Sequence, residues 1–120
     1  MRRLLFRALS TDGNFVTGDI IQLPNMLLIR TADNRIINCI PNTLTQFTGF
    51  FDRQNQPLFE HDMLINGRDE NLCAFIVFDQ DFGAWTLIDE FRNFIDYLDR
   101  DQANLWTAVV DFNFIRRWTS

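Results

Sequence analysis

Turn-forming residues interrupt this 120-residue chain at short intervals, so its regular elements have to be short. Gly, Pro, Asn and Asp favour turns because Gly accepts positive φ, Pro fixes φ, and Asn and Asp hydrogen-bond to nearby backbone. Between the turns, apolar and polar residues alternate over four to eight positions, which is typical of strands and predicts about nine of them. The turn clusters lie at residues 11–14, 18–19, 32–34, 52–57, 66–71 and 79–83.

One segment has a helical rather than an alternating pattern. Phe91, Phe94, Ile95 and Leu98 recur at the spacing of one helix face, and Asp89 stands where a capping residue belongs. The sequence therefore predicts one short helix near residues 90–101 in a mainly β (β-rich α+β) protein. Short strands joined by turns, with many aromatic residues, favour a small β-barrel or sandwich.

The chain is long enough for one compact core, to which 13 Phe contribute. Residues 1–42 form hairpins and end at a Pro-Asn break, so we expect an N-terminal β segment there, packed against a β-barrel domain over residues 43–120. Alternation over 58–65 places Phe59, Met63 and Ile65 on one face of a single strand. The predicted core comprises Phe59, Met63, Phe75, Val77, Trp85, Val110 and Phe112.

Charge is distributed unevenly along the chain. All 11 basic residues are Arg; residues 1–40 carry five Arg against three acids, a net of +2, and residues 41–120 carry six against 13, a net of −7. An acidic body repels phosphate backbones, so we expect no nucleic-acid partner. No apolar run approaches the roughly 20 residues needed to cross a bilayer. We therefore expect a cytoplasmic protein without a membrane partner.

No catalytic or metal-ligating set stands out. His61 and Asp62 are neighbours in a predicted strand, so they point to opposite faces and cannot act together on one atom. The spacing of Asp79, Asp81 and Glu90 resembles a calcium loop, but Ala84 occupies the position where that loop needs Gly. Cys39 and Cys73 lack metal-binding spacing, and buried free thiols are favoured over a disulfide. We expect no enzyme activity, cofactor or metal.

The central stretch from Thr48 to Leu64 resembles the YopX family, whose motif there has the form TGLxDxNGxxIxEGDIV. Its matching positions include Thr48, Gly49, Asp52, Glu60 and Asp62. A second family motif, roughly FRAWDxxxxxMxxGD, resembles the segment from Phe6 to Asp19.

The resemblance implies a small protein of bacteriophages and prophages, acting in the cytoplasm of a bacterial host. It implies an SH3-like barrel over residues 43–120, no activity, and a structural role for Asp62, whose carboxylate would accept backbone N–H groups. Three residues depart from the pattern: Leu9 replaces Trp, Gln56 replaces the turn Gly, and His61 replaces the Gly before Asp62. Because His adopts positive φ less freely than Gly, we expect that turn to be built differently.

Three classes of function follow. The first is a phage or prophage accessory protein that acts by protein–protein contact, as a homo-oligomer or with another phage or host protein. Its interface candidates are Arg2, Arg3, Leu5, Arg7, Leu9 and Phe15, with the arginines facing acids such as Asp96, Asp99 and Asp101. The alternative is a small-ligand or nucleotide-binding protein that uses Arg and aromatic residues at a barrel mouth or subunit interface. An enzyme ranks last.

Overall fold

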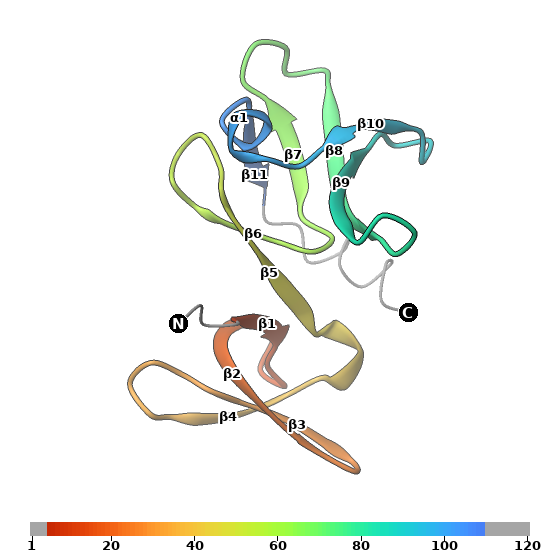
Figure 1. The fold of residues 1–120 in the computed structure, drawn as a ribbon. Helices are drawn as coiled ribbons and strands as arrows, with labels where there is room; N and C mark the ends of the chain where they lie inside the picture. Colours follow the sequence, from red (N-terminus) through yellow and green to blue (C-terminus); the bar gives the residue numbers. More distant parts are fainter. Residues whose placement is uncertain (1–4, 110–120) are drawn as a thin grey trace. The chain divides into compact units, whose positions relative to one another are not determined.

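The computed structural model describes residues 5–109, which divide into two compact units (Figure 1). The first unit extends to Phe47 and the second begins at Thr48. The strand β5 (Thr45–Phe51) runs through this junction. Among the described residues, no helix is long and apolar enough to cross a membrane.

The strands of the first unit belong to a six-stranded antiparallel sheet with the order β4-β3-β2-β1-β5-β6, of which β6 (Pro57–Phe59) lies in the second unit. After β1 (Phe6–Leu9) the chain forms a meander, and a 3₁₀ turn at Pro41–Thr43 leads into β5. The hairpin expected around residues 32–34 is confirmed: Leu27 pairs with Cys39 and Arg30 with Ile36. The other strands of this unit are β2 (Phe15–Leu23), β3 (Met26–Arg30) and β4 (Ile36–Cys39).

The core of the first unit lies on one face of this sheet. It contains Ala8, Val16, Leu27, Ile29 and Cys39, with Ile20, Ile37 and Leu44 packed against it. Burial raises the pKa of the Cys39 thiol, so this group stays protonated at neutral pH. Both cysteines are free, as predicted.

The second unit contains a five-stranded antiparallel sheet with the order β10-β9-β8-β7-β11. Within the described residues its edge strands β10 and β11 are not joined by hydrogen bonds, so no closed barrel is present there. The mainly β class is confirmed, and the SH3-like barrel is not. The elements after β5 are β6 (Pro57–Phe59), β7 (Met63–Asn66), β8 (Cys73–Asp79), β9 (Ala84–Ile88), β10 (Phe94–Tyr97), α1 (Arg100–Ala103) and β11 (Trp106–Val109).

The helix predicted near residues 90–101 is wrong for most of its length. Asp89 caps a hairpin turn instead: its Oδ1 accepts hydrogen bonds from the backbone N–H groups of Phe91 and Asn93, both at 2.8 Å. Arg92 adopts φ 67°, which ends any helix there. The residues that follow form β10. The register of β10 shifts between Phe94 and Asp96, and this irregularity breaks the strand alternation, so that the apolar residues recur at a spacing that also fits a helix.

The core of the second unit uses the opposite parity from the one predicted for residues 58–65. A turn at residues 60–62 splits the expected single strand into β6 and β7. Leu58 and Leu64, which the alternation placed on the other face, are fully buried, while Met63 and Ile65 are half-buried. The core cluster contains Leu58, Leu64, Ala74, Ile76, Leu87, Leu98, Ala103 and Trp106.

The remaining predicted core residues have mixed outcomes. Phe59 and Phe75 are buried, as predicted. Val77 is half-buried, as is Trp85, which packs against the core cluster. The predicted core residues Val110 and Phe112 lie outside the described residues, as does the part of the expected C-terminal strand that follows Val109.

Replacing Ile76 by Ala should lower the free energy of unfolding by about 2–5 kcal/mol, because this side chain is fully buried in the centre of the sheet. Urea denaturation followed by circular dichroism measures the change. Leu72→Ala is the matched control, since Leu72 is 52% exposed, and should cost less than about 1 kcal/mol. A loss for Ile76→Ala as small as that of the control would contradict the assigned core.

Candidate functional site

The turn between β5 and β6 is held by the buried carboxylate of Asp52, one of the residues singled out by the family resemblance. Its Oδ1 accepts from the backbone N–H groups of Gln54 at 2.9 Å and Gln56 at 2.8 Å. Its Oδ2 accepts from the backbone N–H of Ala108 in β11 at 2.9 Å. Asp52 thus joins a local turn to a strand 56 residues later, and its role is structural.

Thr48 and Gly49 shape the strand that precedes this turn. The Oγ1 of Thr48 donates a hydrogen bond to the carbonyl of Leu58 in β6 at 2.9 Å and accepts one from the N–H of Phe50 at 3.2 Å. Gly49 adopts φ 90°, a conformation that other residues rarely take. Both residues therefore serve the backbone of the β5–β6 hairpin.

A second tight turn, at residues 60–62, follows β6. The Oδ2 of Asp62, which is 5% exposed, accepts from the backbone N–H of Phe59 at 2.8 Å. The N–H of His61 donates to the carbonyl of Ile76 in β8 at 2.8 Å, and Glu60 lies beside it with its Oε2 3.9 Å from the His61 Nε2. Asp62 therefore supports the turn, as the resemblance implied.

His61 adopts φ 68°, a left-handed conformation that Gly takes more freely than His does. The expectation that this turn differs from that of the family stays a prediction. The other substituted glycine needs correction: counted from Thr48, the motif glycine falls on Asn55 rather than Gln56, and Asn55 adopts φ 63°. Both turns thus contain a left-handed residue, with side chains in place of the glycines.

Four of the five motif residues, Thr48, Gly49, Asp52 and Asp62, shape the backbone of these two turns. Within residues 5–109, no group of three or more His, Cys, Asp or Glu side chains is arranged to hold a metal ion. The Oδ1 of Asp79, the first residue of the calcium-like spacing, accepts from the backbone N–H of Asp81 at 2.9 Å and of Phe82 at 3.3 Å.

Two of the predicted interface residues are buried, and that part of the interface prediction is corrected. β1 is an interior strand, paired with β2 on one side and β5 on the other, so it offers no free strand edge to a partner. Leu9 is 1% exposed and Arg7 is 8% exposed, with the Arg7 guanidinium 4.7 Å above the ring of Phe15. Leu5 and Phe15 are half-buried. Arg2 and Arg3 lie outside the described residues.

Sequence reasoning missed a group of exposed aromatic side chains, two on the edge strand β10 and one in the β8–β9 turn, because it assigned the residues of β10 to a helix. Phe82, Phe94 and Tyr97 form this aromatic surface and are 72%, 57% and 41% exposed. Their rings are in edge-to-face contact, with centroids 6.3 Å apart for Phe82 and Tyr97 and 5.2 Å apart for Phe94 and Tyr97. A contiguous group of exposed apolar rings is typical of a surface that binds a partner.

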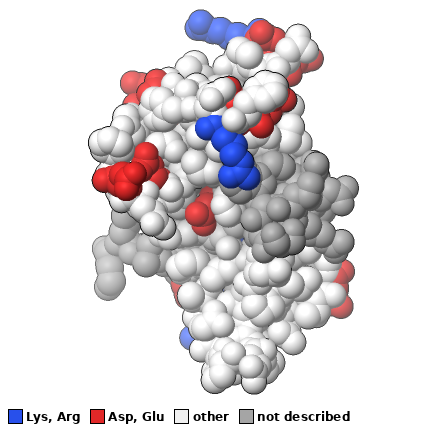
Figure 2. Space-filling view, turned by 90° about the vertical axis from the view of Figure 1, so that its right-hand side faces the viewer, with Lys and Arg blue, Asp and Glu red and all other residues white. Residues whose placement is uncertain are grey.

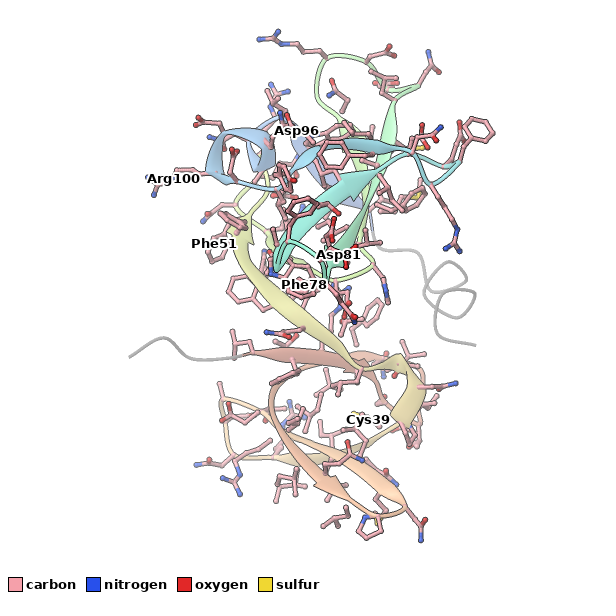
Figure 3. The ribbon with its side chains drawn as sticks, turned by 45° about the vertical axis from the view of Figure 1, so that its right-hand side comes forward. Cys39, Phe51, Phe78, Asp81, Asp96 and Arg100 are labelled. Atoms are coloured by element: carbon pink, nitrogen blue, oxygen red, sulfur yellow. The ribbon has the colours of Figure 1, made fainter. Side chains whose placement is uncertain are left out.

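Acidic residues are frequent in the part of the sequence that carries the aromatic surface. Residues 79–101 carry seven acids against two arginines, a net charge of −5. Asp81 and Asp96, both labelled in Figure 3, directly precede Phe82 and Tyr97 in the sequence. Hydrogen bonds from the backbone N–H groups of Asn93 and Phe91 lower the pKa of Asp89, which keeps it ionised. Acidic side chains gather at several places on the face of the second unit shown in Figure 2. Aromatic faces with nearby carboxylates suit a cationic partner.

A pocket of about 570 Å³ in the first unit is a weaker candidate for a binding site than the aromatic surface. Its lining includes Asp12, Asp33 and Arg35, but the Nε of Arg35 donates to Asp33 at 2.9 Å, so these charges satisfy each other. A hydrogen bond from the Thr31 hydroxyl, together with the charge of Arg35, lowers the pKa of Asp33. The pocket therefore has no spare cation for a phosphate-bearing ligand.

Comparison with models of protein families and with curated proteins finds no match. The function is therefore argued from the geometry of the chain itself.

Replacing Asp52 by Asn should lower the free energy of unfolding by about 2–3 kcal/mol, because an amide offers one acceptor oxygen where the carboxylate serves three N–H donors. Asp69→Asn is a suitable control: Asp69 is exposed and accepts from Asn71, so its loss should stay within about 0.5 kcal/mol. Urea denaturation of both variants is the measurement. Equal stability of the two variants would show that the Asp52 bonds are not needed.

His61 should make the protein less stable as the pH falls. Burial holds the pKa of His61 below its ordinary value of 6.5, against the opposing charges of Glu60 and Asp62. Below pH 6.5 the unfolded chain binds the proton first, so stability is full above that pH and is lost as the pH decreases. Urea denaturation at pH 7.5 and at pH 5.5 measures the effect. The wild-type protein should lose up to about 1 kcal/mol more free energy of unfolding between these two pH values than His61→Asn does, in which Asn tolerates the same φ. An equal loss in both proteins would exclude His61 as the cause.

Proposed function

We propose that this protein is a non-catalytic accessory protein of a phage or prophage that acts by protein–protein contact, as a homo-oligomer in the bacterial cytoplasm. Its phage context rests on the YopX resemblance. The left-handed conformations of Asn55 and His61 support that resemblance, because they fall at both substituted glycine positions of the motif. Part of the same proposal is an SH3-like barrel over residues 43–120, as the resemblance implies.

The observation that carries the proposal is the aromatic surface of Phe82, Phe94 and Tyr97. Phe82 and Phe94 each contact Tyr97, and the three exposed rings present apolar area that a partner would bury. Aromatic residues are enriched in the cores of protein interfaces, while acidic residues are depleted there and stand at the rim. The acids that precede Phe82 and Tyr97 in the sequence fit that arrangement.

We propose that the aromatic surface binds the basic N-terminal segment of a second copy of the chain. This segment carries Arg2 and Arg3, followed by Leu4 and Leu5, and so combines positive charge with apolar side chains. A guanidinium stacks well on an aromatic face, and the net charge of −5 over residues 79–101 attracts it. Arg7 and Leu9 are not part of this contact, because they are buried in their own sheet.

Mass in solution tests this contact. Size-exclusion chromatography with light scattering at tens of micromolar should show an oligomer, since a contact of about −6 to −8 kcal/mol is populated there. Phe82→Ala and Tyr97→Ala should each shift the mass toward the monomer, and so should the double variant Arg2→Glu, Arg3→Glu. Charge reversal is preferable to deleting residues 1–18, which would remove β1 from the interior of its sheet.

Leu72→Ala is the matched control, because it removes an exposed apolar side chain of the same unit away from the aromatic surface and should leave the mass unchanged. Higher salt should weaken the wild-type oligomer, since part of the attraction is ionic. A monomeric wild-type protein at these concentrations would contradict the proposal. An oligomer that resists both the aromatic and the arginine substitutions would place the contact elsewhere.

A further inference from the structure

We propose that the second unit holds an oxyanion-binding site, formed by Arg53, Arg68 and Asn104, which takes the phosphate group of a small ligand. The site is separate from the aromatic surface. It is a pocket of about 450 Å³ lined by Arg53, Gly67, Arg68, Asn104 and Leu105.

Three loops that are distant in the sequence converge on this pocket. Arg53 lies in the β5–β6 turn, Arg68 in the β7–β8 loop, and Asn104 at the end of α1. Backbone hydrogen bonds fix the loops against one another. The N–H of Arg53 donates to the carbonyl of Trp106 at 2.9 Å, and the N–H of Gly67 donates to the carbonyl of Leu105 at 2.8 Å.

Gly67 provides the surface on which the Arg53 guanidinium rests. A Cβ added at Gly67 would lie 2.0 Å from the Nη1 of Arg53, far inside van der Waals contact. Gly67 does not have a positive φ, so its backbone conformation does not itself demand glycine. The missing side chain therefore leaves the space that the guanidinium occupies at the pocket.

The two guanidinium groups are available to a ligand. Within residues 5–109, neither Arg53 nor Arg68 has a carboxylate at ion-pair distance, nor does either guanidinium make a hydrogen bond. Residues 48–109 carry 12 acids and four arginines, a net of −8, yet two of the four arginines line this one pocket. Two neighbouring guanidinium groups without carboxylate partners, in a unit that is otherwise acidic, are suited to bind an anion.

The lining selects the class of ligand. Guanidinium groups bind phosphate or carboxylate through two parallel N–H donors, and a dianionic phosphate gains more from two arginines than a carboxylate does. None of the five lining residues is aromatic, so a nucleobase would find no ring on which to stack. The site should therefore recognise the phosphate group itself rather than a nucleotide.

Calorimetric or NMR titration of the full chain with pyrophosphate, adenosine monophosphate and acetate tests the site. We expect saturable binding of pyrophosphate, no gain from the adenine ring, and weaker binding of acetate. Arg53→Gln and Arg68→Gln should each weaken pyrophosphate binding about tenfold or more, which is the worth of a charge-assisted hydrogen bond. Arg100→Gln, the same change at an exposed arginine outside the pocket, should have no such effect.

Gly67→Ala is the sharpest variant, because it keeps every charge and displaces only the Arg53 guanidinium. It should weaken binding as much as Arg53→Gln does, and Arg53→Lys should restore part of the affinity lost in Arg53→Gln. Lack of saturable pyrophosphate binding would overturn the proposal. So would equal weakening by Arg100→Gln, which would indicate a general charge effect, or unchanged binding in Gly67→Ala.

Discussion

The second unit depends on the carboxylate of Asp52, which joins the two parts of its sequence that are farthest apart. A carboxylate has room for several donors, and here three backbone N–H groups use it: two close the β5–β6 turn and one belongs to β11. This arrangement satisfies donors that would otherwise be buried at the end of a strand and inside a turn. The neighbouring backbone bond from Arg53 to Trp106 strengthens the same junction, and with it the loop that carries the proposed oxyanion site.

Much of the architecture could be read from turn chemistry. The hairpin around Asp33 and Asn34 and the breaks at residues 52–57 and 79–83 lie where Gly, Pro, Asn and Asp cluster, because those residues set local backbone geometry without help from the rest of the chain. The mainly β class followed directly. The resemblance at Thr48 to Leu64 also identified the residues that organise the second unit, although the chain departs from the motif at both glycines.

The failures came from patterns with two physical explanations. Apolar residues at positions 91, 94, 95 and 98 fit one helix face, but a hairpin turn followed by a bulged strand produces the same spacing. The buried face of residues 58–65 was predicted wrongly because alternation alone does not say which of two apolar faces is covered, and the turn centred on His61 was not visible in an apparently continuous strand. The pocket beside Gly67 could not be predicted, since nothing in the sequence relates Arg53 to Asn104 before the three loops are brought together.

The hydrogen bond between Asp52 and Ala108, which are 56 residues apart, also determines when the second unit can be completed during synthesis. As the chain leaves the ribosome from its N-terminus, the strands of the first unit are all available once residue 47 has emerged. The β5–β6 turn can close soon afterwards with the donors from Gln54 and Gln56, but the third donor, on Ala108, is made 56 residues after Asp52. Until then the nascent second unit lacks an edge strand of its sheet, and its partly formed state is exposed to wrong pairing and to chaperones. A truncated product that ends before β11 would remain in that state permanently.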